Sequence, residues 1–336
     1  MNKIIKKLCV VNYIYGEKYQ GFIPLYIISL KESYPEYDVR LYIDNTLNEN
    51  TKEAVNILSE HYGGITVVEN YAQHTKFTKK ATSVQQIQRC QRWLFYDEAF
   101  LDYEAIYIGD IDLLICKEEK PLFEQHKLHC ETVGAPYSNI KRTEPVKKYN
   151  FKIAVRNFVK FGFKQTLKYY FSKTTPPSKF SGLHFVLTKE YYGKIRDLID
   201  DYYNELNLLA EGKSKRYNLC NFNNEAFLRD MIISAGFCDC KEACGKNYNL
   251  ETDATLAAYR PHHGIHLGIF RHPSLIENEN ALITSKLYFS YYRQFKDMKK
   301  CEAYNKVSKY FTSHLNNLIE IMEDFYYKYE GTCNDE

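Results

Sequence analysis

The apolar positions in the first third of the chain predict four strands. Residues 7–15 (KLCVVNYIY) form a nearly continuous apolar run, which is typical of a buried strand. Residues 37–44 (YDVRLYID) instead alternate between apolar and polar side chains, as a half-buried strand does. Two shorter runs, at 65–70 and 105–108, are interpreted as the third and fourth strands.

Helical spacing fills the gaps between these strands. Residues 22–34 and 50–62 have the periodicity of helices, and Asn50 or Thr51 is expected to cap the second one. Residues 83–100 predict a long amphipathic helix. Strands that alternate with helices form a mostly parallel sheet with helices on both faces, so the expected fold class is α/β. Ligands of such sheets bind beyond the carboxyl ends of the strands.

The remaining two thirds of the chain contain fewer strand signals. The elements expected there are a strand at 182–188, helices at 189–209 and 223–235, a turn-rich segment at 254–268, and amphipathic helices within 282–329. No internal repeat or low-complexity linker separates them. The simplest organisation is therefore one catalytic domain over residues 1–275, followed by a helical C-terminal extension over 276–336.

A basic and aromatic segment interrupts this pattern, and we interpret residues 141–178 as an insertion. Residues 141–173 contain ten Lys or Arg and a single acidic residue, Glu144. Within 151–173 the basic residues recur every four positions beside an apolar face, a composition that suits an anionic membrane surface. The alternative is a solvated helix face that covers the catalytic domain. Nucleic acid is not expected as a partner, because the net charge is only +3 and no recognised binding motif is present.

The cysteines and the hydropathy of the sequence predict where in the cell the protein is located. No apolar stretch approaches the roughly 20 residues that span a bilayer, and no signal peptide is recognisable. We read the ten cysteines as reduced thiols, which predicts a cytoplasmic protein. The basic segment leaves open a peripheral position on the inner face of the cytoplasmic membrane.

Two aspartates carry the strongest chemical signal in the sequence. Asp110 and Asp112 follow the fourth predicted strand, within the segment IYIGDIDLLI. Two carboxylates one residue apart at a strand end suit a hard cation such as Mn²⁺ or Mg²⁺, which completes its shell with substrate phosphates. Phosphohydrolases of the HAD type carry a similar element, but they place a Thr where this chain has Leu114. We therefore favour a metal site that serves a diphosphate leaving group.

A histidine cluster provides a second candidate for metal binding. His262, His263 and His266 lie within five residues, next to Gly264 and Gly268. Neutral imidazole binds divalent metals well, so either His263 or His266 is a candidate ligand. The alternative is a turn in which these histidines make ordinary backbone hydrogen bonds.

Taken together, these segments resemble the glycosyltransferases of the GT-A type, whose sheet is Rossmann-like. The nearest pattern is glycosyltransferase family 8 and its relatives in bacterial surface-polysaccharide synthesis. The residues that carry the resemblance are Tyr13, Tyr15, Gly16 and Tyr19 after the first strand, Arg92 before the acidic pair, Gly109 to Asp112, Ser181 to Val186, and Asn223 to Leu228. They span roughly residues 5–270. The segments around Ser181 and Asn224 depart from the family pattern, which affects the acceptor and the stereochemistry.

The resemblance implies transfer of a sugar from a nucleotide-sugar, with UDP as the expected nucleotide, to a glycan or lipid-linked saccharide of a capsule or lipopolysaccharide. The resemblance implies that the nucleotide contacts Asn12, Tyr13 and Tyr19, with Tyr13 stacking on the base. The phosphates would lie near Arg92, or near Lys79 or Lys80, and Mn²⁺ or Mg²⁺ would be bound by Asp110, Asp112 and either His263 or His266. Glu225 would lie near the acceptor. Family 8 enzymes retain the anomeric configuration. In an inverting enzyme Glu225 would be the general base.

A different class of function also fits part of the pattern. A non-catalytic, membrane-associated protein on a transferase fold would keep the basic segment and need no metal. The intact pair of Asp110 and Asp112 argues against that alternative.

Overall fold

A six-stranded sheet forms the centre of the protein. The computed structural model describes residues 5–71, 84–143, 151–171, 178–239 and 263–330. The strands of the sheet, in spatial order, are β3 (Ile65–Val68), β2 (Asp38–Ile43), β1 (Lys6–Ile14), β4 (Tyr103–Ile108), β9 (His184–Leu187) and β6 (Tyr137–Ser138). The first four run parallel, and β9 is antiparallel to both of its neighbours. The expectation of a mostly parallel α/β sheet is confirmed.

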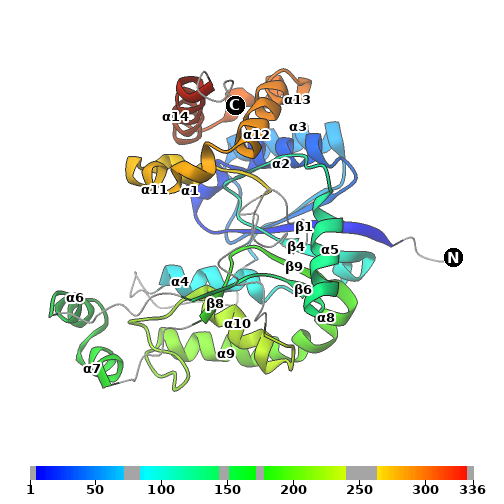
Figure 1. Ribbon diagram of the computed structural model, residues 1–336. Helices are drawn as coiled ribbons and strands as arrows, with labels where there is room; N and C mark the ends of the chain where they lie inside the picture. Colours follow the sequence, from blue (N-terminus) through cyan, green and yellow to red (C-terminus); the bar gives the residue numbers. More distant parts are fainter. Residues whose placement is uncertain (1–4, 72–83, 144–150, 172–177, 240–262, 331–336) are drawn as a thin grey trace.

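Helices cover both faces of the sheet, as Figure 1 shows. Along β1, Leu8 and Val10 belong to one hydrophobic cluster, whereas Cys9 and Val11 belong to the other. Successive side chains of a strand point to opposite faces, so the continuous apolar run of β1 supplies both cores. The first cluster includes α2 (Ile23–Ser33) and α3 (Glu49–Tyr62), and the second includes α8 (Thr188–Ile195), α9 (Ile199–Ala210) and α10 (Asn224–Ser234).

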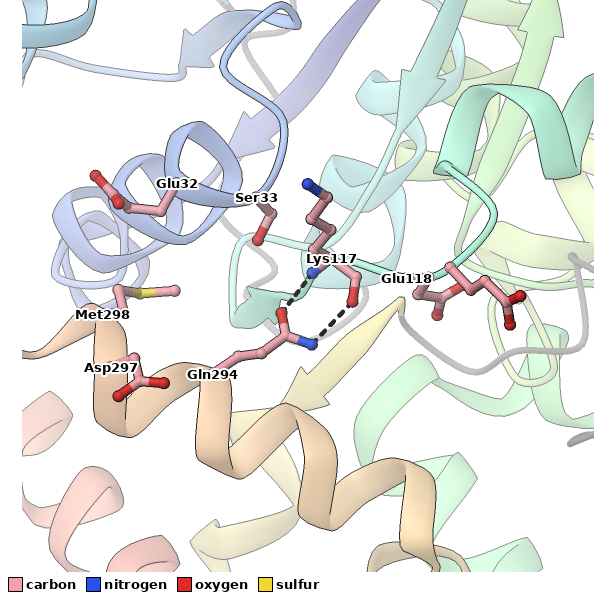
Figure 2. A pocket seen from close by; sticks show the side chains of 8 residues that line it. Glu32, Ser33, Lys117, Glu118, Gln294, Asp297 and Met298 are labelled. Atoms are coloured by element: carbon pink, nitrogen blue, oxygen red, sulfur yellow. Dashed lines mark hydrogen bonds between the residues drawn. The ribbon is translucent and has the colours of Figure 1, made fainter.

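The C-terminal helices pack against the same core as α2 and α3. They are α11 (Pro273–Ile283), α12 (Lys286–Met298), α13 (Glu302–Val307) and α14 (Ser313–Glu330). Two hydrogen bonds tie α12 to the loop after β5 (Leu113–Ile115): the Lys117 N–H donates to Gln294 Oε1 at 2.8 Å, and Gln294 Nε2 donates to the Lys117 carbonyl at 2.9 Å (Figure 2). The division into a catalytic domain and an extension stays a prediction.

Smaller elements complete the described chain. They are two strand pairs, β5 with β10 (Gly264–His266) and β7 (Lys141–Thr143) with β8 (Ser178–Phe180), and the helices α1 (Glu17–Gln20), α5 (Leu122–Val133), α6 (Phe151–Phe161) and α7 (Phe163–Phe171). Residues 151–171 of the basic segment therefore form a helical hairpin, and Figure 1 shows α6 and α7 at one edge of the molecule.

Two local predictions were wrong. The expected helix at 83–100 is a short α4 (Val84–Arg89), a 3₁₀ turn at Cys90–Trp93 and a second 3₁₀ turn at Glu98–Asp102. Leu94, with φ −100° and ψ 15°, leaves the helical region and ends the first 3₁₀ turn. The cap of α3 is Asn48, whose side chain accepts a hydrogen bond from the Thr51 N–H at 2.9 Å.

No helix within the described residues is both long enough and apolar enough to cross a membrane.

Candidate functional site

The acidic pair lies between β4 and β5, beside a cavity of about 620 Å³. Gly109 follows the last residue of β4, and its N–H donates to the Val11 carbonyl at 3.2 Å, which fixes the turn against β1. Asp110 and Asp112 both line the cavity. The cavity lies at the carboxyl ends of β1 and β4, the edge where sheets of this kind bind ligands, and the ligand site itself stays a prediction.

Arg92 holds Asp110 on one side of the cavity. Its guanidinium donates a hydrogen bond to the Asp110 carboxylate, reaches Asn224 Oδ1 at 3.4 Å, and lies 4.2 Å from the ring centroid of Trp93. A Cβ on Gly182 would lie 3.0 Å from an Arg92 nitrogen and 3.3 Å from an Asp110 oxygen. The absence of a side chain at Gly182 therefore leaves room for this ion pair.

Asp112 is held by two residues from the far end of the chain. β10 pairs antiparallel with β5, with His266 opposite Leu113, and the Leu267 N–H donates to the Asp112 carbonyl at 3.0 Å. As a result, His266 Nε2 lies 3.3 Å from the Asp112 carboxylate, and the Arg271 guanidinium donates a hydrogen bond to the same oxygen atom.

The contact between His266 and Asp112 shifts the pKa values of these two groups in opposite directions. Burial alone would raise the pKa of the Asp112 carboxyl, but the His266 hydrogen bond and the charges of His266 and Arg271 outweigh burial and lower that pKa to about 2. Burial would likewise lower the pKa of His266, but the Asp112 carboxylate raises it above its ordinary value. Asp112 is therefore a carboxylate with two positively polarised neighbours.

His263 lies apart from the acidic pair. Its Nε2 atom is 2.9 Å from His126 Nε2, and its Nδ1 atom is 3.4 Å from a carboxylate oxygen of Glu118, within the buried core. His263 precedes β10 and has a φ of +50°, whereas His266 is the last residue of that strand, opposite Leu113. Of the two predicted ligands, the structure brings only His266 to Asp112.

Glu225 enters the same cavity from the first turn of α10. The Asn223 side chain caps that helix by accepting hydrogen bonds from the N–H groups of Glu225 and Ala226, which is the role of an N-cap residue. The Glu225 carboxylate lies 3.1 Å from Lys179 Nζ of β8. A Cβ on Gly182 would lie 3.5 Å from it, so Glu225 faces the same gap as Asp110 and Arg92.

The residues predicted at the nucleotide divide into two groups. Tyr13 and Tyr19 line the cavity, and the Arg271 guanidinium lies 5.6 Å from the Tyr19 ring centroid. Asn12, in contrast, is fully buried, and its amide donates to the Gly109 carbonyl at 3.1 Å. Asn12 therefore supports the turn before Asp110 from behind instead of lining the cavity.

Several residues of the cavity were not among the sequence predictions. Arg89, Lys18 and Asn224 line it, and Lys179 reaches it through Glu225. Arg89 precedes Arg92 by one helical turn, a spacing that could have indicated it. Nothing in the sequence points to Lys179, because its contact with Glu225 crosses from β8 to α10. Lys79, Lys80 and His262 lie outside the described residues.

The donor atoms at the acidic pair suit a divalent cation. Two carboxylates and one imidazole, from Asp110, Asp112 and His266, are a combination that Mn²⁺ accepts well. Arg92 and Arg271 now balance the charge of the two carboxylates. Among the residues that the structure describes, no three His, Cys, Asp or Glu side chains are already gathered around one point. A cation would therefore compete with the two arginines for the same oxygen atoms.

Comparisons with known proteins give similarity only at the level of structure. No protein-family model matches the chain, and no curated protein matches it. The structure is similar to the galactosyltransferase LgtC, solved with donor and acceptor sugar analogues, at 12% identity and a TM-score of 0.35, over 66% of this chain and 69% of that one. It is similar to the mannosyltransferase Ktr4p of S. cerevisiae at 10% identity and a TM-score of 0.41, over 63% of each chain. It is similar to the bifunctional glycosyltransferase WbbM at 13% identity and a TM-score of 0.35, over 67% of this chain and 37% of that one.

Proposed function

We propose that the protein is a glycosyltransferase of the GT-A type that transfers a sugar from a nucleotide-sugar, with UDP as the expected nucleotide. One observation carries the proposal. One cavity at the carboxyl ends of β1 and β4 is lined by three carboxylates, two arginines and a tyrosine. They are Asp110, Asp112, Glu225, Arg92, Arg271 and Tyr13. A volume of about 620 Å³ is within the usual range for small-molecule sites.

The charges of the cavity suit a diphosphate. Arg92 and Arg271 are planar donors that match phosphate oxygens well, and each already faces the cavity from one side of the acidic pair. In this proposal Asp110, Asp112 and His266 hold Mn²⁺ or Mg²⁺. When bound, the cation would neutralise charge on the leaving diphosphate. Tyr13 offers its ring to the nucleotide base.

Glu225 marks the acceptor end of the cavity in this proposal. The contact with Lys179 Nζ at 3.1 Å holds the carboxylate in place and limits its rotation. A carboxylate held in this way is able to accept a hydrogen bond from an acceptor hydroxyl and orient it. This role fits retention of configuration, which the family 8 resemblance implies. For an inverting enzyme the same carboxylate would take the proton from that hydroxyl.

The proposal extends to a glycan or lipid-linked saccharide as acceptor, in the synthesis of a bacterial capsule or lipopolysaccharide. It also places the protein in the cytoplasm, where nucleotide-sugars are made. Seven cysteines of the described chain are free thiols, and four of them are buried, which is compatible with a reducing compartment.

Calorimetric titration of UDP, with GDP for comparison, tests the proposal. We expect UDP to bind in the presence of Mn²⁺, and the Asp112→Asn variant to bind it about tenfold more weakly or less, because the amide cannot replace a charged oxygen ligand. Asp297→Asn is the matched control, since Asp297 is an exposed aspartate on α12 that pairs only with Lys300 among the described residues.

The outcomes separate the two classes of function. Mn²⁺-dependent UDP binding that Asp112→Asn removes and Asp297→Asn preserves would justify a screen of UDP-sugars for transfer. If neither nucleotide binds, with or without metal, the donor site is wrong, and a non-catalytic protein on a transferase fold becomes the better account.

A further inference from the structure

The α6–α7 hairpin presents an apolar stripe to the solvent. Phe151, Val155, Phe158 and Val159 of α6 are spaced so that they share one side of the helix, and their side chains are 82%, 45%, 51% and 79% exposed. Phe163 of α7 is 65% exposed. An amphipathic helix of a globular protein normally turns its apolar side toward the core, whereas these apolar side chains of α6 face the solvent.

The opposite side of the hairpin is the side that packs against the protein. Asn157 and Gln165 are its buried residues. Gln165 Nε2 donates to the Gly212 carbonyl at 2.8 Å, and Lys168 Nζ donates to the Ser214 carbonyl at 3.0 Å. These polar anchors fix which side of the hairpin faces outward. The exposed apolar stripe is therefore a consequence of how the hairpin is attached.

Positive charge accompanies the apolar stripe. Lys152, Arg156, Lys160 and Lys164 are all exposed, and none of them has a carboxylate partner in the described parts of the chain. The sequence has no acidic residue between Glu144 and Glu190. Helical spacing sets Lys152 beside the stripe, and Lys164 lies next to the exposed Phe163 of α7. Arg156 and Lys160 lie further round α6, above the cavity described below. The outward surface therefore combines aromatic side chains with unbalanced positive charge.

We propose that the outward surface of α6 and α7 docks on an anionic lipid bilayer. The apolar stripe would insert at the level of the acyl-chain boundary, while the flanking cations bind lipid phosphates. A protein partner would need an acidic and apolar surface of matching shape. A lipid surface supplies both properties without any such match. Nucleic acid would account for the charges and leave Phe151, Val159 and Phe163 in water.

The hairpin also lies next to the candidate active site. Arg156, Lys160 and Phe161 line a small cavity of about 170 Å³ under α6, together with Gln86 of α4. Gln86 Oε1 accepts a hydrogen bond from Asn224 Nδ2 at 2.9 Å, and Asn224 lines the larger cavity beside Glu225. Docking through the hairpin would thus bring the acceptor end of the site to a lipid surface. This last step rests on the proposed function, whereas lipid docking does not.

Vesicle flotation of the full-length protein tests the inference. We expect binding to phosphatidylcholine vesicles in which about a third of the lipid is phosphatidylglycerol, and weak binding to phosphatidylcholine alone. The double variant Phe151→Ser with Val159→Ser should bind the anionic vesicles about tenfold more weakly. Lys152→Glu with Lys164→Glu should weaken binding in low salt and remove most of its salt dependence.

Matched variants elsewhere on the surface serve as controls. Tyr327→Ser removes an apolar side chain of α14 that is 81% exposed, and Lys52→Glu with Lys189→Glu reverses two exposed charges outside the hairpin. Both should bind vesicles like the wild type, and thermal unfolding should show that every variant is folded. UDP titration without vesicles reports separately on the proposed donor site.

Three results would overturn the inference. The first is wild-type protein that fails to float with anionic vesicles. The second is hairpin variants that float as well as the controls. The third is a dimer in light scattering that Phe151→Ser with Val159→Ser dissociates, because the stripe would then be an interface between two copies of the chain.

Discussion

At the scale of single residues, the two candidate histidines have different environments. His266 contacts Asp112 beside the cavity, while His263 is buried against His126 and Glu118. Replacing His266 removes a donor from the acidic pair and exposes little buried polar surface. Replacing His263 instead leaves two buried partners with one contact fewer, which is costly in a dry interior.

These environments predict opposite phenotypes for two alanine variants. His266→Ala should weaken Mn²⁺-dependent UDP binding about tenfold with little change in the free energy of unfolding. His263→Ala should lower the free energy of unfolding by about 2 kcal/mol and leave the nucleotide affinity of the folded protein nearly unchanged. Calorimetric titration and urea unfolding of both variants check this. The reverse pattern would assign the metal to His263.

At the scale of elements, the pairing of β5 with β10 builds half of the site. The pair joins residues 113–115 to residues 264–266 and brings His266 and Arg271 to Asp112. Gly264 allows the close approach: it has a φ of +152°, and a Cβ there would lie 1.9 Å from the Leu114 carbonyl oxygen. No side chain fits such a gap without separating the two strands.

Gly264→Ala should therefore disrupt this strand pair. We expect a loss of about 3 kcal/mol or more in the free energy of unfolding, with loss of Mn²⁺-dependent UDP binding in any protein that still folds. Gly193→Ala is the control, because a Cβ at Gly193 of α8 meets nothing within 4 Å, and alanine favours a helix by about 1 kcal/mol. Equal stability of the two variants, measured by urea unfolding, would contradict the role of Gly264.

At the scale of the whole molecule, the core contains a group of neutral histidines. Ser138 Oγ lies 2.7 Å from Nδ1 of both His126 and His129, and His184 Nδ1 lies 3.1 Å from the Asn139 amide. Burial lowers the pKa of His126 well below its ordinary range, that of His129 to about 4 and that of His184 to about 3. All three are therefore uncharged in the folded protein at neutral pH.

These buried histidines predict sensitivity to mild acid. In the unfolded chain they titrate near pH 6.5, so below that pH the unfolded state binds more protons than the folded state. Stability is fully present above about pH 6.5 and falls as the pH decreases, with each histidine contributing up to about 1.4 kcal/mol per pH unit. Urea unfolding between about pH 7.5 and pH 5 should show the free energy of unfolding decreasing with pH. In His129→Gln this dependence should be weaker, because one proton fewer is taken up on unfolding. An unchanged slope in that variant would show that His129 is not neutral in the fold.

The sequence by itself determined how strands and helices alternate along the first part of the chain, because periods of two and about 3.6 residues are properties of neighbouring positions. It also located Asp110 and Asp112 at a strand end, since the apolar run of β4 stops at Ile108. The break in the helix expected at 83–100 was harder to predict, because consecutive burial of Trp93, Leu94 and Phe95 depends on what surrounds them.

Only the tertiary structure decided which distant residues meet. Arg271 contacts Asp112 across 159 positions of sequence, and the register of β10 against β5 is what brings His266 to Asp112. Likewise, the burial of Asn12 and the outward turn of the α6 stripe depend on packing between elements. Local periodicity shows that a segment has two different sides, but the contacts made on folding determine which side faces a ligand, the core or the solvent.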